Sequence, residues 1–130
     1  MALVVDASLV VEALISTSSD GLWAEQVLES DELLGPHLLA VECASAIRLA
    51  EIRGTLSPEA AALAYADLQE LPVALLPFHP FGQRIWELRQ NVTPYDAWYV
   101  AIAEAYGISL ATLDRRLAQA NGPRCDFLIP

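Results

Sequence analysis

Short apolar runs alternate with longer amphipathic segments along this chain, and that alternation most constrains its fold. Each apolar run has the length of a single buried strand. The segments between them repeat apolar residues at helical spacing, so strands joined by crossover helices are expected. The alternation therefore predicts an α/β layer fold around a mainly parallel sheet. The strands are expected at residues 2–5, 33–36, 73–77, 109–112 and 126–129.

Several of the amphipathic segments carry recognisable helix start and stop signals. Ser57-Pro58-Glu59 places a capping serine, a proline at the first helical position and an acid in the first turn. Gly54 and Gly107 follow two apolar helical patterns and predict their ends. Helices are expected at residues 7–15, 21–28, 38–52, 58–71, 81–90, 94–106 and 115–120.

The chain is expected to form one domain over residues 1–130, because it contains no repeat, linker or composition boundary. Hydrophobic residues make up 55% of it, which favours a buried sheet plus an apolar surface reserved for a partner. No apolar run approaches the roughly 20 residues of a membrane span. The first residues lack the basic segment of a signal peptide. A cytoplasmic location is expected.

The residue types that are rare or missing exclude several chemistries. Lysine is absent and all seven basic residues are arginine, so no P-loop lysine, Schiff base or Ser–Lys pair is possible. The two cysteines, Cys43 and Cys125, have no metal-binding spacing, and His37 and His79 are not near them. These residues do not form a zinc site, and both cysteines are expected to be ordinary buried or half-buried thiols.

Four acids occupy positions that a parallel sheet could bring together. Asp6 and Asp114 follow predicted strands, Asp96 opens a predicted helix, and Glu42 lies inside one. In parallel sheets the functional site lies beyond the carboxyl ends of the strands. Clustered carboxylates repel one another and persist only if something compensates their charge. Mg²⁺ or Mn²⁺, which prefers carboxylate oxygen and water, is the cation that such a cluster favours.

Each of these acids also has a purely structural interpretation. Asp6 and Asp114 could cap the helices that follow them. Thr93-x-x-Asp96 matches a capping box. Glu42 belongs to a polar stripe that repeats every three residues along its helix, which is typical of a solvated face. Sequence pattern alone leaves these alternatives open.

Charge and aromatic content bear on nucleic-acid binding. The net charge is −10, from 17 acidic and 7 basic residues, which argues against a broad basic face but not against an acidic catalytic pocket. Arg115 and Arg116, beside Asp114, are the best candidates for phosphate contacts, with a structural ion pair as the alternative. The aromatic residues follow helical spacing, so they are expected in the core or at an interface rather than stacked on RNA bases.

Three segments together resemble a known family. They are VVDAS at residues 4–8, AVECASAI at residues 40–47 and TPYDAWYVAIAEAYGISLATLDRRL at residues 93–117. Their order, spacing and chain length are similar to those of the PIN-domain ribonucleases, and more narrowly to the VapC toxins of bacterial toxin–antitoxin pairs. The third segment is the most specific part of the resemblance.

The resemblance implies a PIN-like three-layer α/β/α sandwich and a Mg²⁺-dependent endoribonuclease in which Mn²⁺ can substitute. It places the acidic quartet of the family on Asp6, Glu42, Asp96 and Asp114, with Asp6 and Asp96 as the principal metal ligands. It also implies that two hydroxyl residues, Ser8 and Thr112, line the pocket. It further implies a homodimer and a VapB-like antitoxin, which blocks the site and provides the only link to DNA. The family often has Asn where this chain has Ser45.

Two rival functions use the same acids. A structure-specific DNA nuclease of the same fold would need helical arches and a basic face, for which this short acidic chain leaves little room. A binding module without catalytic activity could instead capture an arginine from a partner in the acidic pocket. Metal-dependent hydrolysis distinguishes the second alternative from an enzyme.

Overall fold

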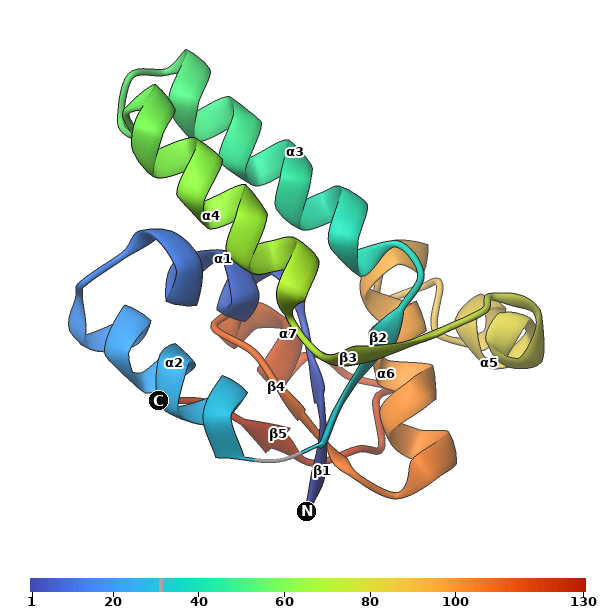
Figure 1. Cartoon of the computed structure of the whole chain (residues 1–130). Helices are drawn as coiled ribbons and strands as arrows, with labels where there is room; N and C mark the ends of the chain where they lie inside the picture. The colour runs from blue at the N-terminus through green and yellow to red at the C-terminus, as the bar shows by residue number, and fades with distance from the viewer. Residues whose placement is uncertain (31) are drawn as a thin grey trace.

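Five parallel strands form the sheet in this computed structural model, within residues 1–30 and 32–130, which the structure describes (Figure 1). Their order across the sheet is β3-β2-β1-β4-β5, so β1 is central and β3 and β5 are the edges. The predicted parallel sheet is confirmed, with every strand pair parallel. The strands are β1 (Ala2–Val5), β2 (Glu32–Pro36), β3 (Val73–Leu76), β4 (Ser109–Ala111) and β5 (Phe127–Leu128).

Helices cover both faces of the sheet, as the predicted α/β/α sandwich requires (Figure 1). On one face α6 contacts β1, β2 and β4, and α5 packs against α6. On the other face α1 contacts α2, α3 and α4. The helices are α1 (Ala7–Ile15), α2 (Ser19–Ser30), α3 (Leu39–Ile52), α4 (Pro58–Glu70), α5 (Gly82–Glu87), α6 (Pro94–Tyr106) and α7 (Arg115–Gln119).

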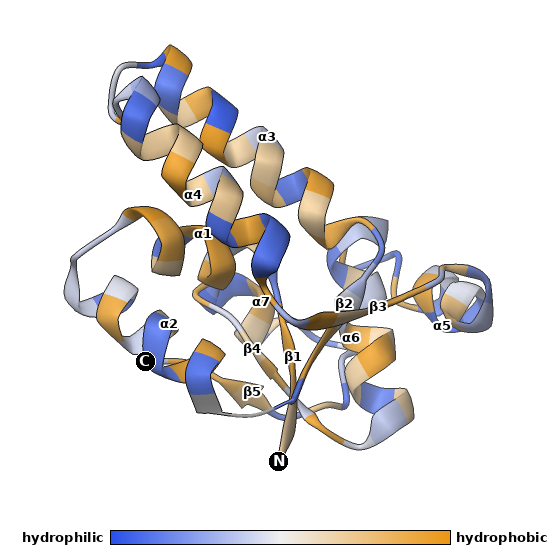
Figure 2. Cartoon of the chain, in the orientation of Figure 1, coloured by the Kyte–Doolittle hydropathy of each residue, from blue (hydrophilic) through white to orange (hydrophobic). Residues whose placement is uncertain are grey.

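The core lies where the central strands meet these helices. Val4, Val5 and Leu110 have no exposed surface, as expected for parallel strands covered on both faces. In Figure 2 the strands carry the hydrophobic colour, whereas hydrophilic bands recur along α3 and α4. None of the helices among the described residues combines the length and apolar character needed to cross a membrane.

Helices α3 and α4 form a hairpin that projects from the sandwich (Figure 1). The predicted signals place its turn correctly: Gly54 has φ of +78°, and the Ser57 hydroxyl accepts a hydrogen bond from the Ala60 amide at 3.1 Å. Val41 and Ile52 on α3 and Leu63 on α4 remain more than half exposed. The hairpin therefore presents apolar side chains to solvent.

The boundaries of two predicted helices need correction. Helix α2 spans Ser19–Ser30 rather than 21–28, because the Ser18 hydroxyl accepts a hydrogen bond from the Gly21 amide and caps the helix earlier. Helix α5 spans Gly82–Glu87 rather than 81–90, after a 3₁₀ turn at His79–Phe81. The Leu88 amide is shared among three preceding carbonyl groups, which tightens the chain and ends this helix.

Candidate acidic site at the carboxyl ends of the strands

The site begins where β1 and β4 end side by side. Val5 and Ala111 are register partners at the carboxyl ends of these strands, and the Asp6 amide donates to the Ala111 carbonyl at 3.3 Å. Asp6 and Thr112 are the next residues on each strand. From β1 the chain passes to β2 and β3 on one side and later returns to β4 on the other. This is the point in the sheet where α/β proteins bind ligands.

Asp6 is buried in a network of hydroxyl donors. Its Oδ1 accepts from the Ser8 hydroxyl at 2.6 Å and from the Leu9 amide at 3.1 Å, and its Oδ2 accepts from the Thr112 hydroxyl. The residue is 5% exposed. The bond from Leu9 shows that Asp6 caps α1, which confirms the capping role expected for this residue. The bonds to Ser8 and Thr112 go beyond capping.

Burial raises the pKa of the Asp6 carboxyl. The hydrogen bonds from Ser8, Thr112 and the Leu9 amide oppose that shift, and the charge of Asp114 adds to it. Ser8 and Thr112, predicted to line the pocket, therefore both contact its most buried acid.

Asp114 combines a cap with a position beside this network. Its Oδ1 accepts from the Arg116 and Leu117 amides at 3.0 and 3.1 Å, so it caps α7 as predicted. Its own amide donates to the Thr112 hydroxyl oxygen at 2.9 Å. Capping engages one oxygen of the carboxylate, which retains Oδ2 for a further ligand.

Asp96 shows that the four acids lie within electrostatic range of one another. It occupies the first turn of α6, where its amide donates to the Thr93 hydroxyl at 3.3 Å. The pKa of its carboxyl is raised to about 6, first by burial and then by the charges of Asp114, Asp6 and Glu42. The hydrogen bond with Thr93 lowers this pKa by a smaller amount. The fold has gathered acids from four separate segments of the sequence.

Glu42 does not belong to a solvated face. It is half-buried in the first turn of α3, and its Oε1 accepts a hydrogen bond from the Tyr99 hydroxyl at 2.7 Å. Burial raises the pKa of the Glu42 carboxyl, the bond from Tyr99 lowers it, and the charge of Asp6 raises it. The other members of its stripe are exposed; they are Ser45, Arg48 and Glu51.

Tyr99 is the residue of this site that the sequence prediction missed. It lies three positions after Asp96 on α6, so the two side chains share a helix face. That spacing was the available signal. Tyr99 is 1% exposed, which confirms the expected core position of its ring.

The acids do not form a ready-made metal cage. Among residues 1–30 and 32–130, no three Asp, Glu, His or Cys side chains converge as a metal-binding set. The charges of the other acids still raise the pKa of Asp96, because charges interact over longer distances than the length of a metal–oxygen bond. The donor chemistry is that of a hard cation, and ligation would require the carboxylates to approach one another.

The surroundings of the acids include a shallow groove and two exposed arginines. A groove of about 410 Å³ runs beside Glu42 between α3 and the start of α6, where Tyr95 is 60% exposed. Arg115 and Arg116 are exposed at the start of α7, and Arg115 donates to the Pro130 carbonyl at 3.3 Å. A cavity of about 590 Å³ near Met1 and Arg124 contains none of the four acids.

Neither cysteine is activated. Burial, with added effects of the Glu42 and Asp6 charges, raises the pKa of the Cys43 thiol to about 12. Burial also raises the pKa of Cys125 to about 11, with the Glu104 charge adding to it. Both thiols are therefore protonated at neutral pH, in agreement with the prediction that they are structural.

Comparison with known families supports the resemblance drawn from the sequence motifs. The family model described as "PIN domain" matches residues 3–123. The chain belongs to the PIN-domain family. That match contains all four acids, and the predicted family is confirmed.

The curated relatives that this chain matches within the PIN-domain family carry the name Ribonuclease VapC. It is 39% identical to Ribonuclease VapC1 of Mycobacterium tuberculosis, over 95% of this chain and 94% of that protein. It is 37% identical to Ribonuclease VapC12 of the same species, over 96% of each chain. Ribonuclease VapC3 of Pyrobaculum aerophilum is 34% identical over 92% of this chain and 94% of its own. The predicted similarity to VapC proteins is confirmed.

Solved structures confirm the fold. PAE2754 from Pyrobaculum aerophilum superposes with a TM-score of 0.69 at 23% identity, over 91% of this chain and 78% of that one. VapC20 of Mycobacterium tuberculosis, a toxin that cleaves the sarcin–ricin loop, gives a TM-score of 0.66 at 17% identity, over 88% and 92%. VapBC2 from Rickettsia felis, bound to a promoter DNA fragment, gives 0.65 at 13% identity, over 98% of each chain.

Proposed function

We propose that this PIN-domain protein is a VapC-type toxin, a Mg²⁺-dependent endoribonuclease whose catalytic site is the cluster of Asp6, Glu42, Asp96 and Asp114. The observation that carries the proposal is the placement of the four acids: Asp6 and Asp114 follow the adjacent carboxyl ends of β1 and β4, and Asp96 and Glu42 lie in the first turns of α6 and α3. An enzyme that binds a divalent cation needs such a concentration of negative charge. The curated relatives carry the name ribonuclease, which supports RNA as the substrate.

The donor set fits Mg²⁺, because all four side chains offer carboxylate oxygen and none offers sulfur or nitrogen. Asp6 and Asp96 would be its principal ligands, with Asp114 and Glu42 completing the site. Bound Mg²⁺ or Mn²⁺ supplies a Lewis acid that polarises the phosphodiester and lowers the pKa of water. The binding of either cation would also offset the mutual repulsion of the carboxylates.

The other residues of the site position its acids or meet the substrate. Ser8 and Thr112 hold both oxygens of Asp6 and thereby fix its side chain against the end of β4. Arg115 and Arg116 are exposed beside Asp114, where they would contact the phosphates of an RNA strand. The chain has only 7 basic residues and a net charge of −10, so a short single-stranded or loop segment is the expected substrate.

The proposed partners follow from the solved relative in complex. VapBC2 from Rickettsia felis was solved bound to a DNA fragment from its promoter. We therefore expect a VapB-like antitoxin that occludes the acidic site, with DNA contacted only through that antitoxin. We also expect a homodimer, in which apolar residues exposed in the single chain, such as Val41 and Tyr95, could become buried.

The two rival functions lack a comparable observation. A DNA nuclease would share the acids, and it is distinguished by its substrate. A non-catalytic module that captures an arginine would bind its partner with or without divalent cations. Both alternatives are therefore resolved by the same cleavage assay.

The test is cleavage of a hairpin RNA, and of a DNA of the same sequence, in Mg²⁺ and in EDTA. The wild-type protein should cleave only the RNA and only with Mg²⁺. Asp6→Asn should slow cleavage by about 100-fold or more, since several kcal/mol of transition-state stabilisation depend on the bound cation. Asp67→Asn, which changes an exposed Asp on α4, is the matched control. Undiminished cleavage by Asp6→Asn would contradict the assignment, and cleavage of DNA alone would favour the rival nuclease.

A further inference from the structure

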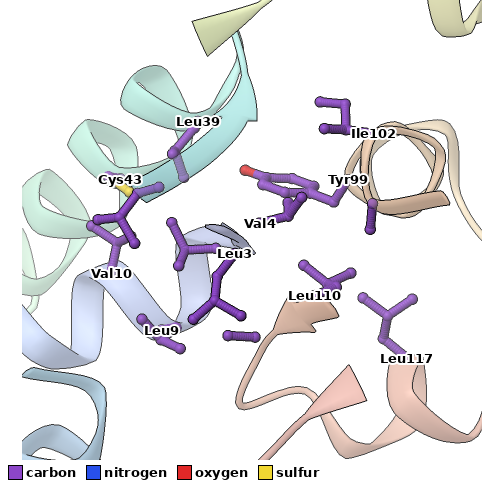
Figure 3. Packing of buried hydrophobic residues seen from close by; sticks show 14 of the residues in the cluster. Leu3, Val4, Leu9, Val10, Leu39, Cys43, Tyr99, Ile102, Leu110 and Leu117 are labelled. Carbon is purple, nitrogen blue, oxygen red and sulfur yellow. The ribbon is translucent and has the colours of Figure 1, made fainter. Parts of the chain in front are cut away.

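The hydroxyl of Tyr99 is a polar group in an otherwise apolar environment. The ring lies near Val4, Leu39 and Ile102, and its oxygen is directed toward α3 (Figure 3). A buried phenol requires a hydrogen-bond partner, because an unpaired buried polar group loses its hydrogen bonds to water without replacement. Here the partner is Glu42 Oε1 at 2.7 Å, a residue 57 positions away in the sequence.

The bond joins two helices that each carry an acid of the candidate site. Tyr99 and Asp96 share a face of α6, while Glu42 lies in the first turn of α3. A glutamate side chain freed from such a bond gains rotational entropy. Holding Glu42 beside α6 therefore restricts it to the neighbourhood of the other acids before any cation arrives.

The bond also constrains how Glu42 can act. Oε1 is engaged by the Tyr99 hydroxyl at 2.7 Å. The carboxylate retains its second oxygen for a further ligand. Hydrogen bonds of this kind, made to a carboxylate that binds a metal, orient the ligand and tune its affinity.

We propose that Tyr99 is a positioning residue, whose hydroxyl holds the Glu42 carboxylate in place for a divalent cation in the acidic site. This role rests on the proposed function, because it requires the site to bind Mg²⁺ or Mn²⁺. The alternative is that Tyr99 only fills the core, in which case its ring matters and its hydroxyl does not.

The variant that separates the two is Tyr99→Phe, which keeps the ring and removes the hydroxyl. Mn²⁺ binding is measured by the loss of the electron paramagnetic resonance signal of free Mn²⁺ on titration with intact protein. Tyr99→Phe should weaken Mn²⁺ affinity about 10-fold, at the lower end of the effect expected when a partner of a metal ligand is lost. Tyr106→Phe, at an exposed tyrosine of the same helix, should leave affinity within twofold of wild type.

A second pair of variants tests whether the hydroxyl acts through Glu42. Glu42→Ala should weaken Mn²⁺ binding at least as much as Tyr99→Phe does, and adding Tyr99→Phe to it should cause no further loss. Glu42→Ala with unchanged affinity would overturn the proposal, and this result does not depend on the stability of Tyr99→Phe. An equal further loss in the double variant would also overturn it.

The same titration distinguishes a failure of the Tyr99 role from a failure of the proposed function. If wild-type protein binds Mn²⁺ and folded Tyr99→Phe binds it equally well, Tyr99 is a core residue and the proposed function stands. If wild-type protein binds no Mn²⁺ at millimolar concentration, the proposed function fails and the role of Tyr99 fails with it.

Discussion

The Thr112 hydroxyl, which has no exposed surface, donates a hydrogen bond to Asp6, although the two residues lie 106 positions apart in the sequence. They follow register partners on β1 and β4, so parallel pairing of the central strands brings them together. The bond links the integrity of the sheet to the orientation of the most buried acid.

Thr112→Val should weaken both stability and cleavage, because it keeps the shape of the side chain but removes a donor to buried Asp6. We expect the free energy of unfolding at pH 7 to fall by about 1–3 kcal/mol, and cleavage to slow by about 10- to 100-fold. Urea denaturation and a single-turnover RNA assay measure the two effects. Thr112→Ser retains the hydroxyl and should lose far less cleavage activity. Equal cleavage losses in both variants would show that the methyl group, rather than the hydroxyl, is important.

The contribution of Asp96 to the stability of the metal-free protein should decrease as pH rises. The Asp96 carboxyl has a pKa of about 6 in the folded state against 3.8 for the ordinary residue, so the folded protein binds its proton more tightly. The resulting stabilisation is fully present below about pH 4 and is lost as pH rises through about 6. Since Asp96 is partly exposed, we expect its contribution to be about 1–2 kcal/mol.

The measurement is urea denaturation in EDTA at pH values between 4 and 7. Asp96→Asn should flatten the decrease and stabilise the metal-free protein at pH 7, even though the same change should abolish cleavage. A profile that is unchanged in Asp96→Asn would contradict the electrostatic description of the cluster.

The Arg84–Glu104 ion pair should matter for stability and not for cleavage. Arg84 Nε lies 2.7 Å from Glu104 Oε1, and the Arg84 guanidinium also donates to the Gly122 carbonyl at 2.9 Å. Burial alone would raise the pKa of Glu104, but hydrogen bonds from Arg84 and from the Arg124 amide bring it below its ordinary value.

Arg84→Ala should lower the free energy of unfolding by about 1–3 kcal/mol, because Glu104 keeps its charge and loses its partner. The loss should be largest above the ordinary Glu pKa and should diminish in acid, as Glu104 becomes protonated. Denaturation at pH 4 and pH 7 measures this dependence. A large loss of RNA cleavage in folded Arg84→Ala protein would assign this region a role in activity that we do not expect.

Arg116 should contribute to RNA binding through a phosphate contact. Arg116→Ala should weaken the binding of RNA to the inactive Asp6→Asn protein and reduce the slope of log affinity against log salt by about 0.7, the value expected for one contact to a single strand. Arg53→Ala, at an exposed position in the turn between α3 and α4, is the matched control and should change neither quantity. If the two variants behave alike, Arg116 does not contact the substrate.

Most of the fold could be predicted from sequence, because its signals are local. Ser57 and Gly107 mark helix ends through their own hydroxyl or backbone freedom, and the structure confirms both. The early start of α2 and the early end of α5 were missed. The first depends on a serine cap outside the apolar pattern, and the second on carbonyl groups that share one amide.

Some residues of the candidate site could be placed from the sequence pattern and others could not. Asp6 and Asp114 could be placed because they follow strands whose ends meet at one edge of a parallel sheet. Glu42 was placed by the family resemblance alone, because a repeat of three along a helix describes only that helix. Whether Glu42 faces solvent depends on how α6 packs beside α3, and the bond from Tyr99 forms only in that packing.

The most direct test of the central claim is a crystal structure of the protein soaked in Mn²⁺ and measured at the manganese absorption edge. Anomalous density should appear within ligand distance of both the Asp6 and Asp96 carboxylates, at about the 2.0–2.2 Å expected for a hard divalent cation and oxygen. The same density should disappear in Asp96→Asn crystals. Fully occupied Mn²⁺ elsewhere, with the Asp6 and Asp96 side chains directed apart and no density between them, would contradict the proposed metal site.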